Sequence, residues 1–298
     1  MERVSRLVDN EEGRIVVVQA KENVMKFVFL IAACMSIISV TLICFFMFGN
    51  GIPAIKEIGI GEFLLGDVWR PNNDIYGIFP MIIGSIYVTA GAIIIGVPIG
   101  LLCAIFMAYC CPKGLHKVLK PAIDLLAGIP SIVYGFFGLV VIVPIVQYMY
   151  GGSGKSILTA SIMLGIMILP TIVSVSESSL RAVPRSYYEG SLALGATHER
   201  SVFFTVLPAA KSGILAAVIL GVGRAIGETM AVNMIAGNQT VMPESIYDGV
   251  RTMTANIVTE MGYATGLHRE ALIATAVVLF VFILIINLSF MAIKKNDK

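Results

Sequence analysis

The 298-residue chain carries a net charge of +2, with 57% hydrophobic and only 13% charged residues. Soluble domains contain about 25% charged residues, so lipid must replace water over much of this protein's surface. The small net charge gives no sign of nucleic-acid binding. The three histidines and five cysteines form no metal-ligand spacing and no disulfide framework, so we expect neither a metal nor a cofactor.

Six apolar runs are long enough to cross a bilayer, which takes roughly 20 residues of helix. In chain order they cover residues 25–49, 77–109, 121–150, 156–176, 209–237 and 271–293. Prolines inside several runs are compatible with membrane helices, because neighbouring helices can satisfy the freed backbone groups. The sequence therefore predicts an all-α, polytopic membrane protein with six transmembrane helices.

Lysine and arginine residues are distributed unevenly between the two sides that six spans define. One side consists of the N-terminal segment, the second and fourth loops and the C-terminal tail, and it holds 15 of these residues, whereas the other side holds five. Cytoplasmic loops are enriched in Lys and Arg. We therefore expect a multi-pass protein of the cell inner (cytoplasmic) membrane with both termini in the cytoplasm.

The predicted cytoplasmic loop at residues 181–208 is much longer than the few residues of a usual helix–helix connection. Pro184, followed by an apolar-periodic run from Tyr187, predicts a helix start, and Gly195 predicts the turn that ends it. One interpretation is an amphipathic helix that lies on the membrane surface. The other is a helix on which a cytoplasmic motor docks.

The same loop contains a spaced motif. Three residues separate Ser191 from Gly195, and nine separate Gly195 from the run that begins at Thr205. The motif residues are Glu189, Gly190, Ser191, Gly195, Leu207 and Pro208. This spacing resembles the EAA loop of ABC-importer permeases, although glycine and serine replace its two alanines and Thr205 replaces its isoleucine. The resemblance implies that the motif residues form a coupling helix, which sits in a cleft of a separate ATP-binding subunit. It also implies a transport subunit that is not itself an enzyme, with ATP hydrolysis carried out by that partner.

Charged residues inside predicted spans are the candidates for a solute pathway. Arg224 and Glu228 lie near the middle of the fifth run, and their separation of four residues places them on one face of a helix. An arginine at the bilayer centre costs about 2.5–3.5 kcal/mol on insertion scales, so it faces a bundle interior or an aqueous cavity. Two interpretations remain open: a structural ion pair, or an Arg224 that contacts an anionic solute while Glu228 orients it. For Asp124 and Glu177, near the predicted cytoplasmic span ends, we expect interfacial or helix-contact groups.

Three further stretches carry a more specific resemblance. They are residues 223–229 (GRAIGET), residues 126–135 (LAGIPSIVYG) and residues 63–71 (FLLGDVWRP), the last followed by Tyr76 and Gly77. They resemble the corresponding regions of phosphate-importer permeases of the PstC type. The resemblance covers nearly the whole chain from the outer loop at residue 63 to the sixth span.

This resemblance implies a type I ABC-importer permease fold. Residues 1–24 would form a cytoplasmic N-terminal segment, residues 25–49 a peripheral first transmembrane helix, and residues 77–293 a core of five transmembrane helices. The implied partners are a second homologous permease subunit, a dimer of cytoplasmic ATP-binding subunits and an extracytoplasmic phosphate-binding protein. The implied function is ATP-driven translocation of inorganic phosphate by alternating access.

Three alternatives remain on the sequence alone. The same machine could carry another oxyanion, such as molybdate or sulfate, because the coupling loop would look alike. An ion-coupled secondary transporter could use Arg224 and Glu228 in a relay, but it would have no motor to dock on the loop. A channel is disfavoured by the absence of an obvious ring of pore-lining charge in the sequence.

Overall fold

The computed structural model describes residues 2–296, with the side chains of residue 19 and of residues 21–292. The chain divides into two compact units, Met1–Asn50 and Gly51–Lys298. Helix α1 (Glu2–Ile58) forms the first unit and continues into the second, so the predicted N-terminal segment and first span are parts of one helix. Several residues behind the predicted orientation lie outside the described side chains: Arg3, Arg6, Arg14, Lys294, Lys295 and Lys298.

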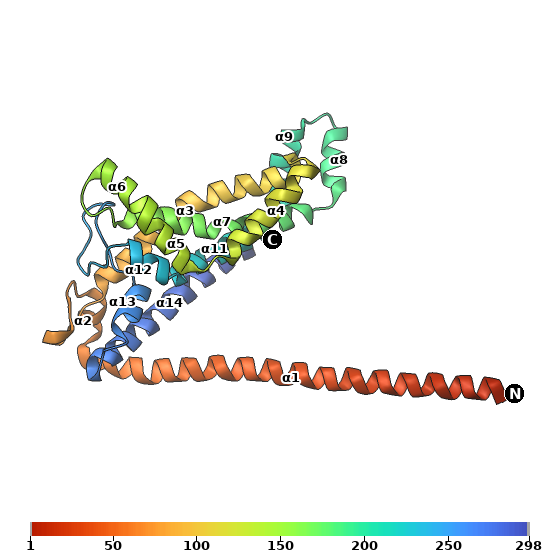
Figure 1. Cartoon of the computed structure of the whole chain (residues 1–298), viewed down its shortest axis with the longest axis horizontal. Helices are drawn as coiled ribbons and strands as arrows, with labels where there is room; N and C mark the ends of the chain where they lie inside the picture. Colours follow the sequence, from red (N-terminus) through yellow and green to blue (C-terminus); the bar gives the residue numbers. More distant parts are fainter. Residues whose placement is uncertain (1, 297–298) are drawn as a thin grey trace. The chain divides into compact units, whose positions relative to one another are not determined.

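The second unit begins with helix α2 (Ile60–Leu65) and a small antiparallel hairpin, in which β1 (Trp69–Arg70) pairs with β2 (Ile75–Tyr76) across the turn η1 (Pro71–Asn73). All the other regular elements of this unit are helices (Figure 1). Its elements are α3 (Phe79–Ile105), η2 (Phe106–Cys110), α4 (Lys113–Gly128), α5 (Ser131–Phe137), η3 (Gly138–Ile142), α6 (Val143–Tyr150), α7 (Ile157–Arg181), α8 (Arg185–Ala193), α9 (His198–Ser201), η4 (Val202–Val206), α10 (Leu207–Ala209), α11 (Lys211–Gly227), α12 (Met230–Ile235), α13 (Met253–Glu260) and α14 (Gly266–Asn296).

Within the described part of the chain, five helical segments are long and apolar enough to cross a membrane. They are Lys21–Ile58, Phe79–Cys110, Ser131–Tyr150, Ile157–Arg181 and Gly266–Ala292. A sixth is present if His198–Ala209 and Lys211–Gly227, which are bent by 73° relative to each other, form one span. The predicted all-α, multi-span architecture is confirmed. The bend lies at Ala210, at the start of the predicted fifth run, and a second interruption, at Glu228 and Thr229 between α11 and α12, divides that run further along.

The third span also differs from its predicted bounds, because it begins at Ser131 and not at residue 121. Helix α4 ends at Gly128, and Ile129 has an extended backbone with φ −68° and ψ 128°. The following residue is Pro130, whose ring disfavours the helical conformation of the residue before it. Residues 121–128 therefore belong to a separate helix, which packs against α7.

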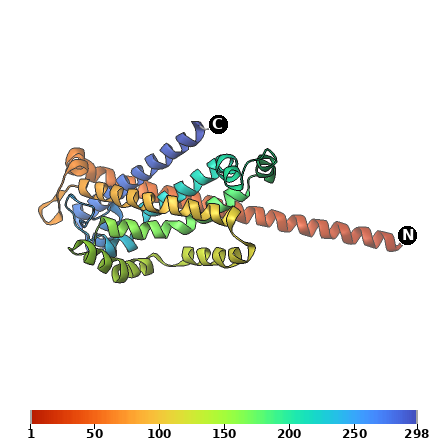
Figure 2. The same cartoon turned by 90° about the horizontal axis from the view of Figure 1, so that it is seen from above.

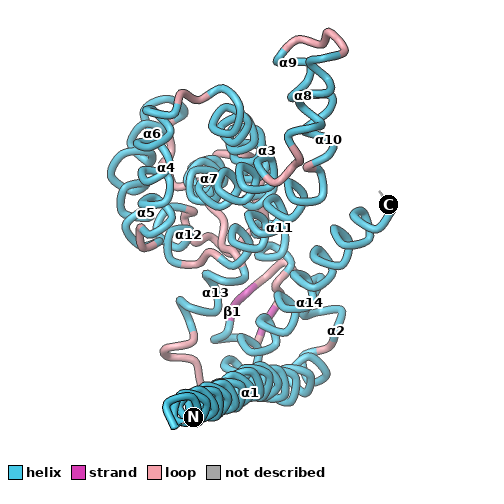
Figure 3. Tube along the Cα trace, turned by 90° about the vertical axis from the view of Figure 1, so that its right-hand side faces the viewer, coloured by secondary structure: helices cyan, strands magenta, loops and turns pink. Residues whose placement is uncertain are grey.

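Helix α7 is the centre of the second unit, and Figure 3 shows α3, α5, α11 and α12 arranged around it. Two-thirds of its apolar stretch is buried. Close packing depends on small residues: a Cβ added to Gly96 of α3 would lie 2.8 Å from the Gly165 carbonyl oxygen of α7. Helix packing in membranes relies on such small residues, because lipid provides no hydrophobic driving force between helices.

The loops of the second unit gather at two opposite ends of the bundle. Figures 1 and 2 show α8 and α9 at one end, whereas the β1–β2 hairpin and the turn between α13 and α14 lie at the other. The charged break in the fifth span lies between these ends, where α11 gives way to α12. The fold thus separates three regions of interest: the end that carries α8 and α9 (the loop end), the break between α11 and α12, and the end that carries the β1–β2 hairpin (the hairpin end).

Candidate functional site

The fifth span is interrupted between Arg224 and Glu228. Helix α11 ends at Gly227, and Glu228 has an extended backbone with φ −71° and ψ 129°. The expectation that the two residues share one helix face is therefore wrong, because Glu228 lies beyond the helix end. Glycine is a poor helix former, so Gly227 weakens the helix where it stops.

The break is held by specific hydrogen bonds on both sides of Glu228. Its carboxylate oxygen Oε1 accepts from the backbone N–H of Ala231 at 3.3 Å, which satisfies a free amide at the start of α12. Its backbone carbonyl accepts from Thr254 Oγ1 at 3.2 Å, a contact that brings in α13. Glu228 is thus fixed as a cap of the second half of the span.

Arg224 has a different partner. Its Nη1 donates to Thr171 Oγ1 of α7 at 3.2 Å, and the side chain is half-buried. Among the described residues it forms no ion pair with Glu228 or with any other acid. A guanidinium carries five N–H donors, so most of them are not engaged by the described residues. The structural ion-pair interpretation does not describe this conformation, and the cation is available to an anion.

The motif of the loop at residues 181–208 lies at one end of the bundle, on α8, on α10 and in the turn after α8. Helix α8 carries Glu189, Gly190 and Ser191, and Leu207 and Pro208 open α10. The predicted helix start is confirmed, since Pro184 occupies the position before α8. The predicted turn is also confirmed: Gly195 has φ +87°, the left-handed conformation that glycine adopts without strain.

Helix α8 presents most of its surface outward. Glu189 and Gly190 are exposed, and Leu194 at the helix end is 92% exposed. Ser191 faces inward, where its hydroxyl accepts from Ser201 Oγ at 3.0 Å and ties α8 to α9. The serine that replaces an alanine of the EAA pattern therefore has a structural role, and the outer face of α8 remains open for a partner.

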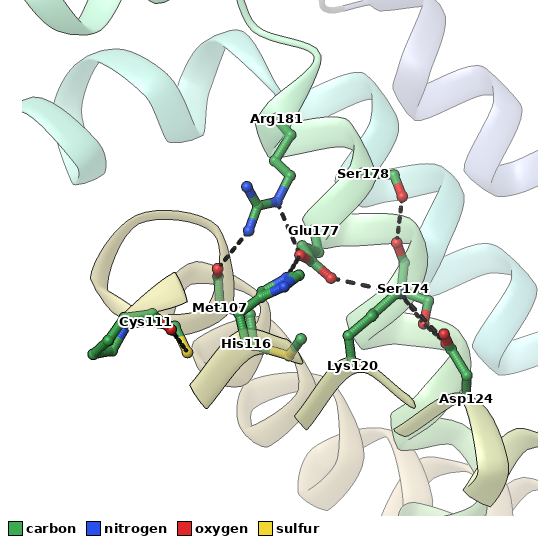
Figure 4. Close-up of polar contacts among 10 residues, drawn as sticks. Met107, Cys111, His116, Lys120, Asp124, Ser174, Glu177, Ser178 and Arg181 are labelled. Atoms are coloured by element: carbon green, nitrogen blue, oxygen red, sulfur yellow. Dashed lines mark hydrogen bonds and ion pairs between the residues drawn. The ribbon is translucent and has the colours of Figure 1, made fainter. Parts of the chain in front are cut away.

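A buried acid at the same end of the bundle joins α4 to α7. Glu177 is 3% exposed, and its Oε1 lies 2.6 Å from His116 Nε2 and 2.9 Å from Arg181 Nε. Lys120 Nζ lies 3.5 Å from the other carboxylate oxygen and 3.4 Å from Asp124 (Figure 4). The expectation that Glu177 and Asp124 are helix-contact groups is confirmed. His116 was missed, because no sequence signal connects it to an acid 61 residues away.

A second buried acid organises the hairpin end. Glu260 is 5% exposed and pairs with Arg251, while its Oε2 accepts from Trp69 Nε1 at 2.9 Å. His268 Nε2 lies 2.8 Å from the same oxygen. The network joins the hairpin, α13 and α14 around one carboxylate. Sequence reasoning gave no sign of it, because its members are distributed over 200 residues of chain.

Solved structures share this fold. The chain superposes with a TM-score of 0.62 on a chain of the MetNI methionine ABC transporter, covering 78% of this chain and 100% of that one at 18% identity. A chain of a bacterial ABC transporter that imports alginate gives a TM-score of 0.60, with 88% and 94% covered at 15% identity. The arrangement of spans is that of type I ABC-importer permeases, as predicted.

The family follows from sequence comparison. Residues 96–296 match the model of the binding-protein-dependent transport system inner membrane component, and the chain belongs to this family. It is 39% identical over 296 residues to the probable ABC transporter permease protein YqgH of Bacillus subtilis, covering 96% of this chain and 92% of that protein. It is 36% identical over 248 residues to the phosphate transport system permease protein PstC of Haemophilus influenzae, covering 76% and 78%. For PstC of Pasteurella multocida the identity is 33% over 258 residues, covering 80% and 81%.

These comparisons confirm the resemblance to PstC-type permeases and the class of the protein. The chain is an integral membrane permease subunit of an ABC importer. Such a subunit works with an ATP-binding subunit and a substrate-binding protein. Its spans are the apolar helices described above.

Proposed function

We propose that the chain translocates inorganic phosphate across the inner membrane and that Arg224 contacts the anion on its way. The observation that carries this proposal is the Arg224 guanidinium, which lies inside a span, forms one hydrogen bond to Thr171 and is not neutralised by Glu228. The planar guanidinium matches the oxygens of phosphate in a bidentate geometry. The relatives named as phosphate permeases support the choice of solute.

Glu228 has a second role in this proposal. Its carboxylate holds the start of α12 and leaves Arg224 unpaired, so it fixes the geometry of the break and repels an anion that moves beyond the guanidinium. Such an arrangement lets the solute bind transiently, which a transport pathway requires.

The loop at residues 181–208 is the proposed docking element for the ATP-binding subunits. Glu189, Gly190 and Ser191 on α8, with Gly195 in the turn after it, would enter the partner's cleft, and Leu207 and Pro208 would transmit the motion to α11 through α10. The exposed face of α8 and its outward Leu194 support this role. A second homologous permease and a phosphate-binding protein complete the proposed complex.

The remaining parts take the roles expected from the resemblance. Residues 1–24 form a cytoplasmic segment, residues 25–49 a peripheral span and residues 77–293 the core, with both termini in the cytoplasm. ATP binding draws the two ATPases together, the loops move, and the spans open outward to receive phosphate. Hydrolysis by the partner returns the inward-facing state.

Another oxyanion is the second candidate. The relative from Bacillus subtilis is named only as a probable ABC permease, and the solved structures handle methionine and alginate. Molybdate and sulfate carry the same kind of oxygens as phosphate, so Arg224 alone does not choose among them. Competition by molybdate and sulfate during phosphate uptake distinguishes the three anions.

The test is uptake of labelled phosphate in cells that lack the chain and are complemented with wild type, Arg224→Gln or Arg269→Gln. Arg269 is an exposed arginine at the start of α14 and serves as the control. We expect wild type and Arg269→Gln to restore uptake that molybdate and sulfate do not compete. Arg224→Gln should reach the membrane at normal levels and fail. If wild type restores no phosphate uptake although the partners are present, the solute assignment is wrong and the permease assignment stands.

A further inference from the structure

A polar cavity lies beneath α8, at the loop end of the bundle and away from the break in the fifth span. Its volume is ≈ 380 Å³, and it is lined by residues of η2, the end of α7, α8 and the start of α9. The lining residues that define its chemistry are Tyr109, Arg181, Arg185, Tyr188, Glu189 and His198. Two arginines and a histidine thus share a cavity with two tyrosines and one acid.

The wall of the cavity is fixed by its own contacts. The rings of Tyr109 and Tyr188 lie 5.6 Å apart, and the Tyr188 hydroxyl lies 2.6 Å from His198 Nδ1. The Tyr109 hydroxyl donates to the Leu180 carbonyl at 3.2 Å. The aromatic side of the cavity is therefore held in place before any ligand arrives.

The two arginines supply donors that the protein does not use. Arg181 donates from Nε to Glu177 and from Nη2 to the Met107 carbonyl at 2.8 Å, and Figure 4 shows its third nitrogen pointing away from both partners. Arg185 makes no hydrogen bond or ion pair with any described residue. Both arginines line the cavity together with Tyr109. One donor group is positioned in advance and the other is unengaged.

We propose that this cavity binds a phosphate group, held between Arg181 and Arg185. Guanidinium groups form short, charge-assisted hydrogen bonds with phosphate oxygens, often as bidentate pairs. A phosphate group at this end of a membrane helix bundle comes either from an anionic lipid headgroup or from free phosphate. The donors are the same for both sources, and the tests below separate them.

Glu189 makes the site relevant to the motor. Glu189 lines the same cavity, so a bound anion repels its carboxylate and favours a position turned outward. This consequence rests on the proposed function of α8 as the coupling helix. A phosphate group bound in the cavity then changes the position of Glu189, which the ATP-binding subunit would contact. Binding of the phosphate group itself does not depend on the coupling role of α8.

The experiment measures binding to the purified full chain in two settings. In detergent, equilibrium binding of radiolabelled inorganic phosphate tests the free anion. In nanodiscs of phosphatidylcholine with phosphatidylglycerol, native mass spectrometry counts the anionic lipid retained by each chain. The variants are Arg185→Gln and, as a matched control, Arg200→Gln, an exposed arginine on α9 that lies over the Phe204 ring at 5.9 Å and outside the cavity. Arg224→Gln in the same assays reports the proposed solute contact separately.

We expect Arg185→Gln to weaken binding roughly tenfold, since a hydrogen bond to a charged group is lost, and Arg200→Gln to leave it unchanged. A loss for labelled phosphate identifies the free anion, and a loss of retained phosphatidylglycerol identifies the lipid. The proposal is overturned if neither ligand responds to Arg185→Gln, or if Arg200→Gln weakens binding equally. Loss of phosphate binding in Arg224→Gln alone supports the proposed function and still overturns this site.

Discussion

Two pairs of glutamate and arginine residues have the same four-residue separation and opposite outcomes. On α7, Glu177 and Arg181 form an ion pair at 2.9 Å within a buried network. In the fifth span, Arg224 and Glu228 do not meet, because α11 ends at Gly227 and Glu228 caps α12 instead. Residues four apart are neighbours only where the helix continues. A paired charge then supports packing, whereas an unpaired one inside a span is available to a solute.

The largest expected effect is on the paired side of this comparison. Glu177→Ala leaves His116, Lys120 and Arg181 without their buried carboxylate, and breaking a buried pair in this way costs about 3–5 kcal/mol. The free energy of unfolding in detergent, from denaturant titration, measures the loss. The control is Asp124→Ala, whose side chain is 55% exposed and whose loss should stay below about 1 kcal/mol. Equal losses in the two variants would mean that Glu177 does not hold α4 to α7.

Double-mutant cycles compare the two pairs directly. The alanine cycle for Glu177 and Arg181 should give an interaction energy of about 1–3 kcal/mol, because the residues are in contact within one network. The cycle for Arg224 and Glu228 should give less than about 0.5 kcal/mol, since each has a separate partner. Unfolding free energies of the single and double variants supply both values. A large interaction energy for the second pair would restore the ion-pair interpretation.

A smaller effect is expected where the break is tied to α13. Thr254→Val removes the hydroxyl that donates to the Glu228 carbonyl and keeps the side-chain shape, so we expect a loss of about 1 kcal/mol in the free energy of unfolding. Thr259→Val is the matched control, because Thr259 is exposed on the same helix and should change stability less. If the control loses as much, the Thr254 contact does not stabilise the break.

The smallest stability effect should come from Glu228→Gln. The amide oxygen can still accept from the Ala231 N–H, so the free energy of unfolding should change by less than about 0.5 kcal/mol. Phosphate uptake per unit of membrane protein should nevertheless change, since the negative charge beside the pathway is gone. Uptake identical to wild type would show that Glu228 acts only as a helix cap.

Local signals in the sequence were sufficient to predict the helix in the loop at residues 181–208. Pro184 and Gly195 determine the start and end of α8 through their own backbone preferences, so both were predicted. The break after Gly227 was not, because the apolar run continues through it, and the break is stabilised by a local hydrogen bond from Ala231 and a tertiary one from Thr254.

The Glu177–His116 and Glu260–His268 networks show the same limit of sequence reasoning. The third span was misjudged for a different reason: Ile129–Pro130 carries a local signal against helix that its apolar surroundings obscured. Buried polar contacts between distant segments follow from packing, and a single sequence does not display them.

The central claim is that Arg224 is unpaired because it serves the solute. Its most direct test is the rate of phosphate uptake by Arg224→Gln, expressed per chain in the membrane, with the free energy of unfolding measured on the same variant. We predict that uptake falls at least tenfold while stability changes by less than about 1 kcal/mol, since only the Thr171 hydrogen bond is lost. Uptake at the wild-type rate, or a loss of stability as large as that of Glu177→Ala, would contradict the account.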